Sequence, residues 1–310
     1  MITVLAGGVG AARLLVGLAR AVPPERVTAV VNTGDDTVLH GLHVSPDLDT
    51  VTYTLAGAVN PSTGWGLDGE SFVAMDALDR YGGLTWFRLG DRDLATHLYR
   101  AGRLADGATL STVTREIADA WGVVPRLLPM SDDPVRTRIE LASGDEVEFQ
   151  EYFVKLRHAV AVRSVRFDGA AVAAPAPGVI DALRDAALVV VAPSNPVVSV
   201  GPILSVPGIA AALVARRDRV VAISPIVAGA ALKGPADRLL SELGGEASVV
   251  GVARVLRDVA GTLVIDEADR ELAPEVEAAG MRCVVTTTVM RTAEISRGLA
   301  LDVLRVGGLA

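Results

Sequence analysis

The fold is decided by residues 2–36, ITVLAGGVGAARLLVGLARAVPPERVTAVVNTGDD. Ile2 to Leu5 is a short apolar run, Gly7 to Gly10 is a glycine-rich turn, and residues 11–21 carry apolar side chains at helical spacing. Two prolines then end the helix, and the β-branched run Val27 to Val31 follows. This order predicts a strand, a helix and a second parallel strand, the βαβ unit of an α/β sheet.

Strand-like runs alternate with helical segments again in the C-terminal half of the chain. The runs are residues 188–192, 220–224, 262–265 and 283–286, and a final helix is expected at 292–304. We therefore predict a doubly wound, Rossmann-like, mainly parallel sheet. Ligands bind such sheets at the carboxyl ends of the strands.

The middle of the chain departs from this alternation. Residues 47–110 have a mostly helical pattern, whereas 135–141, 146–153 and 160–167 alternate like antiparallel strands around a turn at 143–145. We predict an inserted β-rich subdomain at 129–174. The Rossmann-like core would then comprise residues 1–128 and 175–310.

Composition narrows the function classes. Half of the 310 residues are apolar and the net charge is -8, which excludes a disordered chain and a broad basic surface for nucleic acid. The single Cys283 excludes a disulfide framework and a cysteine zinc site, and its place in a predicted strand indicates an inert thiol. The N-terminus has no signal-peptide pattern, and no apolar run approaches the roughly 20 residues of a membrane span. We expect a soluble cytoplasmic protein.

The turn Gly7 to Gly10 opens a helix directly after a strand. Glycines let a phosphate approach the backbone, and the helix N-terminus adds free N–H groups. A structural tight turn is the alternative. An NAD site is disfavoured, because Arg13 stands at the third glycine position and Asn32, not an acid, ends the second strand.

Carboxylates cluster in the two segments that follow. Asp35 and Asp36 lie after the second strand, and Asp47 and Asp49 lie a short distance along the chain. Such oxygens suit Mg²⁺, and one of them could accept a proton from an attacking hydroxyl. The alternative is that Asp47 or Asp49 caps the next helix.

Three later segments also carry candidate polar groups. Residues 88–93 hold Arg88 and Asp91 in a charged turn, which is either a ligand clamp or ordinary surface. Ser194 and Asn195 lie between two prolines at a strand end. Lys233 is one of only two lysines beside 27 arginines, and in a glycine-containing loop it indicates a site for a compact cation. The four histidines show no metal-binding spacing, so we do not expect histidine ligands.

These segments, in this order, resemble one family: the 2-phospho-L-lactate transferases, called phosphoenolpyruvate transferases in actinobacteria, of coenzyme F-420 biosynthesis. The matching stretches are GGVGAA at 7–12, VNTGDD at 31–36, HGL at 40–42, SPDLDT at 45–50, LGDRDLATH at 89–97, PMSDD at 129–133, PSNP at 193–196 and KGP at 233–235.

The resemblance implies a Rossmann-like, usually dimeric enzyme that requires Mg²⁺. The terminal ribityl hydroxyl of 7,8-didemethyl-8-hydroxy-5-deazariboflavin would attack the guanosine diphosphate ester of phosphoenolpyruvate or 2-phospholactate, with release of GMP. The family binds the acceptor at positions matching Asp49 and Arg88, and archaeal members can carry Lys at the second. The arginine- and alanine-rich composition is typical of a GC-rich actinobacterial genome and favours the enolpyruvyl donor.

The resemblance and the residues together assign expected roles. We expect Gly8 and Gly10 to cradle the diphosphate, and Lys233, Ser194 and Asn195 to bind phosphate or nucleotide. Asp49 or Asp36 would act in catalysis, with Asp49, Asp35 and Asp36 as Mg²⁺ ligands. The expected ligand-binding set is completed by Gly7, Asn32, Arg88, Asp91 and Gly234. The alternative function is a nucleotide-sugar-binding regulator of the same superfamily, and an NAD oxidoreductase is a third, disfavoured one.

Overall fold

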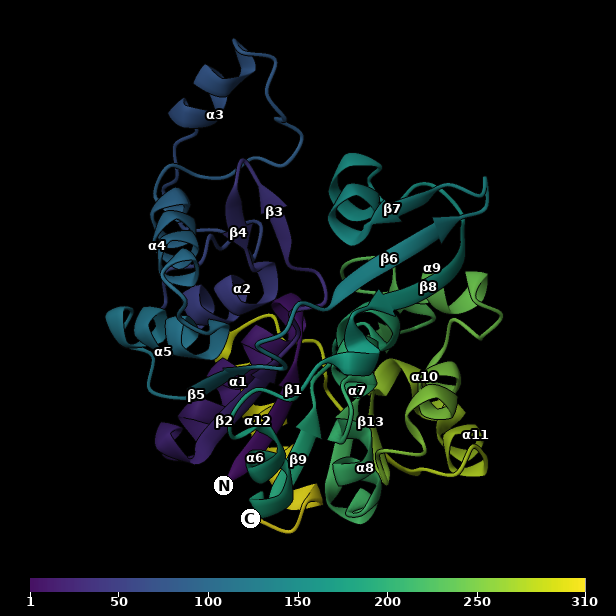
Figure 1. The fold of residues 1–310 in the computed structure, drawn as a ribbon. Helices are drawn as coiled ribbons and strands as arrows, with labels where there is room; N and C mark the ends of the chain where they lie inside the picture. Colours follow the sequence, from purple (N-terminus) through teal and green to yellow (C-terminus); the bar gives the residue numbers. More distant parts are fainter. Residues whose placement is uncertain (310) are drawn as a thin grey trace.

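A seven-stranded parallel sheet forms the centre of the computed structural model, which describes residues 1–309 (Figure 1). The strand order is β14-β13-β10-β9-β1-β2-β5, and every neighbouring pair is parallel. The predicted Rossmann-like fold class is confirmed. The strands are β1 (Ile2–Ala6), β2 (Val27–Val31), β5 (Arg126–Pro129), β9 (Leu188–Val191), β10 (Val220–Ile223), β13 (Thr262–Asp266) and β14 (Arg282–Thr286).

Helices cover both faces because strand side chains alternate between them. Ile2, Val4 and Ala6 pack on the face covered by α1 (Gly8–Ala21) and α12 (Ala293–Val306), whereas Leu5 joins the core on the opposite face. A Cβ at Gly17 would lie 2.2 Å from the Ser296 carbonyl oxygen, so this glycine allows α1 and α12 to pack closely. The other helices of the core are α2 (Pro46–Leu55), α5 (Leu110–Ala120), α6 (Val179–Asp185), α7 (Gly201–Ser205), α8 (Ile209–Val214), α9 (Ala236–Glu242), α10 (Val249–Leu256) and α11 (Ala273–Ala278).

The chain reverses direction across the sheet between β1 and β9. From β1, the next strands run outward through β2 to β5, and the later strands run from β9 in the other direction. The loops after β1 and β9 therefore meet at a topological switch point, which is where open α/β sheets bind ligands.

The predicted β-rich segment forms a separate three-stranded antiparallel sheet of order β7-β6-β8. Its strands are β6 (Arg136–Leu141), β7 (Glu146–Glu148) and β8 (Val162–Asp168). The second strand is shorter than predicted, because residues 151–155 form a π-helical turn instead. At the junction with the core, Ser131 donates to the Ala174 carbonyl at 2.6 Å, and Asp133 accepts from the Ala174 N–H at 2.8 Å.

An arm comprising residues 57–92 projects from the body beyond α4 (Asp93–Ala105) (Figure 1). It contains α3 (Val73–Asp79) and stands near the hairpin of β3 (Thr37–Leu39) and β4 (Leu42–Val44). A second short hairpin, β11 (Ile226–Val227) and β12 (Ala230–Ala231), precedes α9. Across residues 1–309, no helix combines the length and the apolar character needed to cross a membrane.

Candidate active site

The glycine turn after β1 packs directly on the loop after β9. Ser194 Oγ donates to the Gly7 carbonyl at 2.8 Å and accepts from the Gly7 N–H at 3.3 Å. A Cβ at Gly10 would lie 2.3 Å from the Pro193 carbonyl oxygen, so a larger residue would separate the two loops. These two predicted binding loops therefore form one continuous surface at the switch point.

Three carboxylates surround the buried Asn32 at the end of β2, and we call Asn32, Asp35, Asp36 and Asp47 the Asn32 cluster. Asn32 Nδ2 donates to Asp47 Oδ2 at 2.9 Å and to Asp35 Oδ1 at 3.2 Å. Asp47 also accepts the N–H of Gly8, which joins the cluster to the glycine turn. Asp47 is thus a contact residue between loops and does not cap α2, whose N-cap is Ser45.

Asp36 has one engaged and one free carboxylate oxygen. His43 Nε2 and Ser45 Oγ both lie 2.8 Å from Oδ2. Oδ1 is buried and has no hydrogen-bond partner among the described residues. A buried polar atom without a partner is costly, so this oxygen is available to a ligand, a cation or a proton.

The Asn32 cluster carries negative charge that no arginine or lysine pairs with in residues 1–309; its only salt-bridge partner is His43. Burial raises the pKa of Asp35 well above its ordinary value, and repulsion from Asp47 and Asp36 raises it further. Burial also raises the pKa of Asp47 to about 7, with a smaller contribution from the charge of Asp36. A divalent cation would relieve this repulsion.

A second buried cluster lies beside the first, and we call Asp49, Asp93, His97 and Arg100 the Arg100 cluster. Arg100 pairs with both oxygens of Asp49: Nη2 contacts Oδ1, and Nη1 lies 3.2 Å from Oδ2. His97 Nε2 lies 3.3 Å from Asp93 Oδ2, and the Tyr53 hydroxyl donates to Asp93 at 2.6 Å. Helix α4 supplies three of the four residues at positions i, i+4 and i+7, on one helical face.

Asp49, Asp93 and His97 offer three ligand atoms that all lie within 4.8 Å of one another. This triad is a possible metal site that we did not predict, because the histidine spacing in the sequence showed no metal pattern. Arg100 already neutralises Asp49, however, and Mg²⁺ prefers oxygen ligands to imidazole nitrogen. The carboxylates of the Asn32 cluster have no arginine or lysine within 4.0 Å among residues 1–309, although the charge of Arg136 reaches Asp35. They offer oxygen ligands, the kind that Mg²⁺ prefers.

Arg88 and Asp91 belong to the arm. Arg88 is exposed, pairs with exposed Asp76 at 2.6 Å and lies 4.9 Å above the Phe72 ring. Asp91 accepts from Ser71 Oγ at 2.5 Å and from the N–H groups of Val73 and Ala74 at 2.9 and 3.0 Å. Asp91 therefore stabilises the start of α3, and no contact between described residues joins Asp91 to either cluster.

Lys233 is held near the glycine turn by the loop at 60–66. Its Nζ contacts the Thr63 carbonyl and lies 5.2 Å from the Trp65 ring centroid. A Cβ at Gly64 would lie 3.0 Å from Val9 and 3.1 Å from Lys233 Nζ, which places the ammonium beside the start of α1. Burial and the charge of Arg13 lower the pKa of Lys233. Gly234 has a φ of +71°, which explains a glycine directly after the lysine.

The remaining predicted residues are accounted for by the fold. Asn195 Oδ1 accepts from the Val197 and Val198 N–H groups at 2.9 and 3.3 Å, so its side chain caps the following turn. Cys283 is half-buried in β14, and burial raises the pKa of its thiol to about 11, in keeping with the predicted inert cysteine.

Comparisons with known proteins agree with the loop pattern. Residues 2–294 match the family model of 2-phospho-L-lactate transferase CofD. The chain is 45% identical to a phosphoenolpyruvate transferase of Streptomyces griseus, over 98% of each chain. It is 44% identical to a phosphoenolpyruvate transferase of Thermobifida fusca, over 87% of each chain.

A solved structure shares the fold at low sequence identity. The crystal structure of a UPF0052 family protein from Bacillus halodurans aligns over 98% of both chains with a TM-score of 0.64 and 17% identity. On the family match and the 45% identical relatives, the chain belongs to the 2-phospho-L-lactate transferase CofD family of transferases.

Proposed function

We propose that this protein transfers a phosphoenolpyruvyl or 2-phospho-L-lactyl group from its guanosine diphosphate ester to the terminal ribityl hydroxyl of 7,8-didemethyl-8-hydroxy-5-deazariboflavin. The observation that carries the proposal is the Asn32 cluster, an uncompensated group of carboxylates beside the glycine turn at the switch point. Relatives at 43–45% identity that bear the name phosphoenolpyruvate transferase favour the enolpyruvyl donor.

In the proposed reaction, the ribityl oxygen forms a bond to the phosphorus that bears the three-carbon acid. The bond from that phosphorus to the bridging oxygen breaks, and GMP leaves with the electron pair. The hydroxyl proton passes to a base, and the product is a phosphodiester, (dehydro) coenzyme F-420-0. Phosphoryl transfer of this kind depends mainly on positioning and on stabilisation of charge.

We assign Asp36 as the base that accepts the hydroxyl proton, because its Oδ1 is free while His43 and Ser45 hold Oδ2 in place. A carboxylate fixed at one oxygen and open at the other can accept a proton without reorganising. Asp49, which we expected as the first candidate, has both oxygens on Arg100, so we propose that it helps to position the acceptor instead.

Asp35 and Asp47 would hold Mg²⁺, since they share one amide group and repel each other. When bound, the ion would supply positive charge for the phosphates of the donor. Lys233 and the glycine turn would contact the same phosphates from the other side of the switch point. Arg88 keeps the acceptor-binding role that the family resemblance implies.

We also propose that the protein forms a homodimer. The arm exposes large apolar side chains, among them Val73 at 71% and Tyr81 at 86%, and a second copy would cover them. Light scattering should give twice the monomer mass. Tyr81→Lys should shift that mass toward the monomer, whereas a monomeric wild type would contradict this part of the proposal.

The direct test incubates the purified protein with the deazaflavin, Mg²⁺ and each guanylated donor separately, and follows GMP and product mass. We expect product, with the enolpyruvyl donor preferred when both donors compete. Absence of product with either donor would overturn the proposal. Binding of a nucleotide-sugar without any turnover would point instead to the regulatory alternative.

A further inference from the structure

Four arginines lie on β6 and β8 of the inserted sheet, and three of them pair with carboxylates. Arg138 lies 3.1 Å from Glu148, Arg163 lies 3.0 Å from Glu140, and Arg166 lies 2.8 Å from Glu146. Arg136 has no carboxylate partner within 4.0 Å in residues 1–309, and its Nη1 donates only to the carbonyl of its neighbour Val135 at 3.1 Å. Arg136 is therefore the free cation of this sheet.

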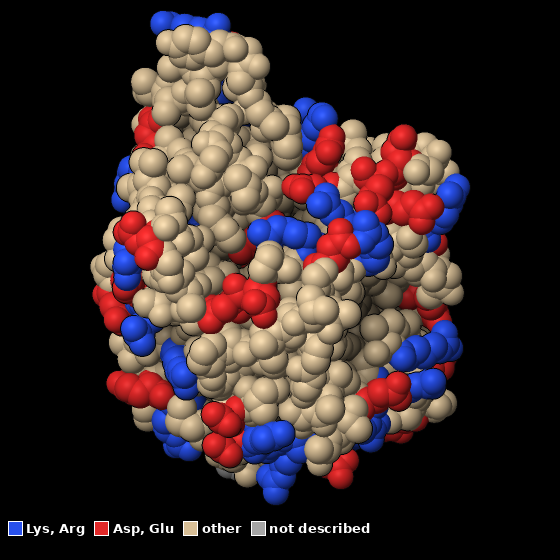
Figure 2. Space-filling model, viewed as in Figure 1, with Lys and Arg blue, Asp and Glu red and all other residues tan. Residues whose placement is uncertain are grey.

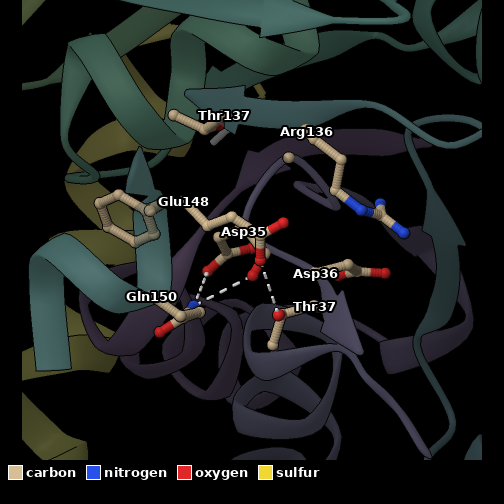
Figure 3. Close-up of a pocket in the computed structure, with 9 residues that line it drawn as sticks. Asp35, Asp36, Thr37, Arg136, Thr137, Glu148 and Gln150 are labelled. Carbon is tan, nitrogen blue, oxygen red and sulfur yellow. Dashed lines mark hydrogen bonds between the residues drawn. The ribbon is translucent and has the colours of Figure 1, made fainter. Parts of the chain in front are cut away.

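Arg136 lines a small cavity between the inserted sheet and the Asn32 cluster together with Asp35, Asp36 and Glu148 (Figure 3). Glu148 already accepts from Thr37 and Arg138, and Asp35 from Asn32. Asp36 keeps Oδ1 without a partner, and yet no oxygen of Asp36 lies within 4.0 Å of the Arg136 guanidinium. The guanidinium thus remains available to an anion that comes from outside the protein.

The placement of Arg136 relative to the site limits which anion it meets. Figure 3 shows its guanidinium and the Asp36 carboxylate on the same side of the cavity, and the charge of Arg136 reaches Asp35. Asp36 is the residue to which we assigned the proton of the attacking hydroxyl. A group bound by Arg136 would therefore lie close to Asp36, on the side of the inserted sheet.

The proposed donor carries anions of two kinds. Its diphosphate faces the glycine turn, Lys233 and the carboxylates that would hold Mg²⁺. Its carboxylate belongs to the three-carbon acid, one carbon away from the ester oxygen on the transferred phosphorus. A planar guanidinium binds a carboxylate through two parallel hydrogen bonds, and a partly buried one does so with little competition from water.

We propose that Arg136 binds the carboxylate of the three-carbon acid and thereby selects donors that carry a carboxylate next to the transferred phosphate. This inference rests on the proposed function and gives the inserted sheet a role in substrate selection. It assigns the residue to donor recognition only; the deazaflavin acceptor does not contact it.

The test measures, by calorimetry in the presence of Mg²⁺, how tightly wild type and Arg136→Gln each bind two ligands. The ligands are the guanosine diphosphate ester of lactate and its isopropyl analogue, in which a methyl group replaces the carboxylate. Arg136→Gln should weaken binding of the lactyl ester by about 10–100-fold, as expected for loss of a charged hydrogen-bonded pair. It should change binding of the isopropyl ester by less than about twofold.

Arg163→Gln is the matched control, because Arg163 lies on the same sheet but pairs with Glu140, away from the cluster. It should bind both esters as wild type does. Arg138 is unsuitable as a control, because its removal would free Glu148 to pair with Arg136. Arg136→Lys should fall between wild type and Arg136→Gln, since it keeps the charge and loses the planar fork.

The outcomes separate this inference from the proposed function. Equal weakening of both esters by Arg136→Gln would mean that Arg136 acts on the diphosphate or the fold, and unchanged binding of both would remove it from the site; either result overturns the inference. If wild type binds the lactyl ester through Arg136 but transfers nothing, the proposed function is wrong and the inference on Arg136 stands. If wild type binds neither the lactyl nor the enolpyruvyl ester, the proposed function and the inference are both wrong.

Discussion

Helix α2 contributes one carboxylate to each of two neighbouring buried clusters, and the two clusters differ in their positive charge. Asp49 enters the Arg100 cluster and meets a guanidinium at both oxygens. Asp47, two residues earlier, enters the Asn32 cluster and meets an amide and a backbone N–H. Asp49 is therefore paired with an arginine, whereas the carboxylates of the Asn32 cluster have no arginine or lysine within 4.0 Å among residues 1–309.

In the proposed function, this difference separates the positioning role of Asp49 from the chemical role of the Asn32 cluster. Asp49 already has a bidentate arginine, whose charge opposes the rise in the Asp49 pKa that burial causes, so it gains less from a metal ion or a proton. Carboxylates that repel each other and share one amide gain from both. Figure 2 shows acidic and basic groups mixed on the viewed face around a central hollow. The surface charge of this face therefore does not distinguish the two clusters. The difference between them lies in how their buried side chains are paired.

The largest effect is expected from removing the cation of the Arg100 cluster. Arg100→Leu leaves Asp49 buried without a partner, which should lower the free energy of unfolding by about 3–5 kcal/mol in urea denaturation. Adding Asp49→Asn should recover part of this loss, because the unpaired charge is then gone. Arg103→Gln, which removes a partly exposed pair with Glu116 on the same helix, should stay near wild type. An Arg100→Leu variant as stable as Arg103→Gln would contradict a buried pair.

The next effect concerns turnover. Asp36→Asn should lower kcat by about 10²–10⁴-fold, the range for loss of a general base, while circular dichroism and donor affinity stay close to wild type. Asp258→Asn serves as the control, because Asp258 is an exposed carboxylate that belongs to neither cluster. Near-normal kcat in Asp36→Asn would remove this residue from the chemistry and return Asp49 as the candidate base.

The pH dependence of the stabilisation of the protein by Mg²⁺ is a further test of the difference between the two clusters. Because the pKa of Asp47 is about 7 in the folded protein and 3.8 ordinarily, its contribution to stability without metal falls as pH rises from about 4 to about 7. Mg²⁺ competes with that proton, so the rise in Tm on adding Mg²⁺ should be larger at pH 8 than at pH 5.5.

Asp47→Asn provides the control for this measurement. It should remove most of the difference between the two pH values, and without Mg²⁺ it should raise Tm at pH 8 by about 2–4 °C, since one repelling charge is gone. An equal Mg²⁺ effect at both pH values in the wild type would show that Asp47 does not bind the ion.

The part of the fold that could be predicted from the sequence is the part with strongly patterned apolar segments. The glycine turn between two apolar strands, and the later β-branched runs, specify parallel strands in sequence alone. Strand β5 was missed because it lacks β-branched residues, begins with Arg126 and ends with Pro129. Its place at the edge of the sheet depends on pairing with β2, which short-range patterns do not reveal.

The sequence singled out candidate loops but not the pairs that their side chains form. Asp35, Asp36, Asp47 and Asp49 form one group by sequence proximity. Only the fold brings Arg100, 51 residues away, to Asp49 and leaves Asp47 without a cation. The spacing of Asp93, His97 and Arg100 on one helical face was the available signal, but charged residues at that spacing usually face solvent.

The smallest effect is expected in the arm, outside both clusters. Asp91→Ala removes the acceptor for the Val73 and Ala74 N–H groups, so amide exchange at these two positions should accelerate. Affinity for the guanylated donor and kcat should remain unchanged. A loss of donor affinity would place Asp91 in the ligand site, as the sequence first indicated.

The central claim is that the metal belongs to the Asn32 cluster and not to the Arg100 cluster. Crystals soaked in Mn²⁺, a stand-in for Mg²⁺ that scatters anomalously, test it without any substitution. We predict an anomalous peak at the oxygens of Asp35 and Asp47. A peak between Asp49, Asp93 and His97, with the Asn32 cluster empty, would contradict the account.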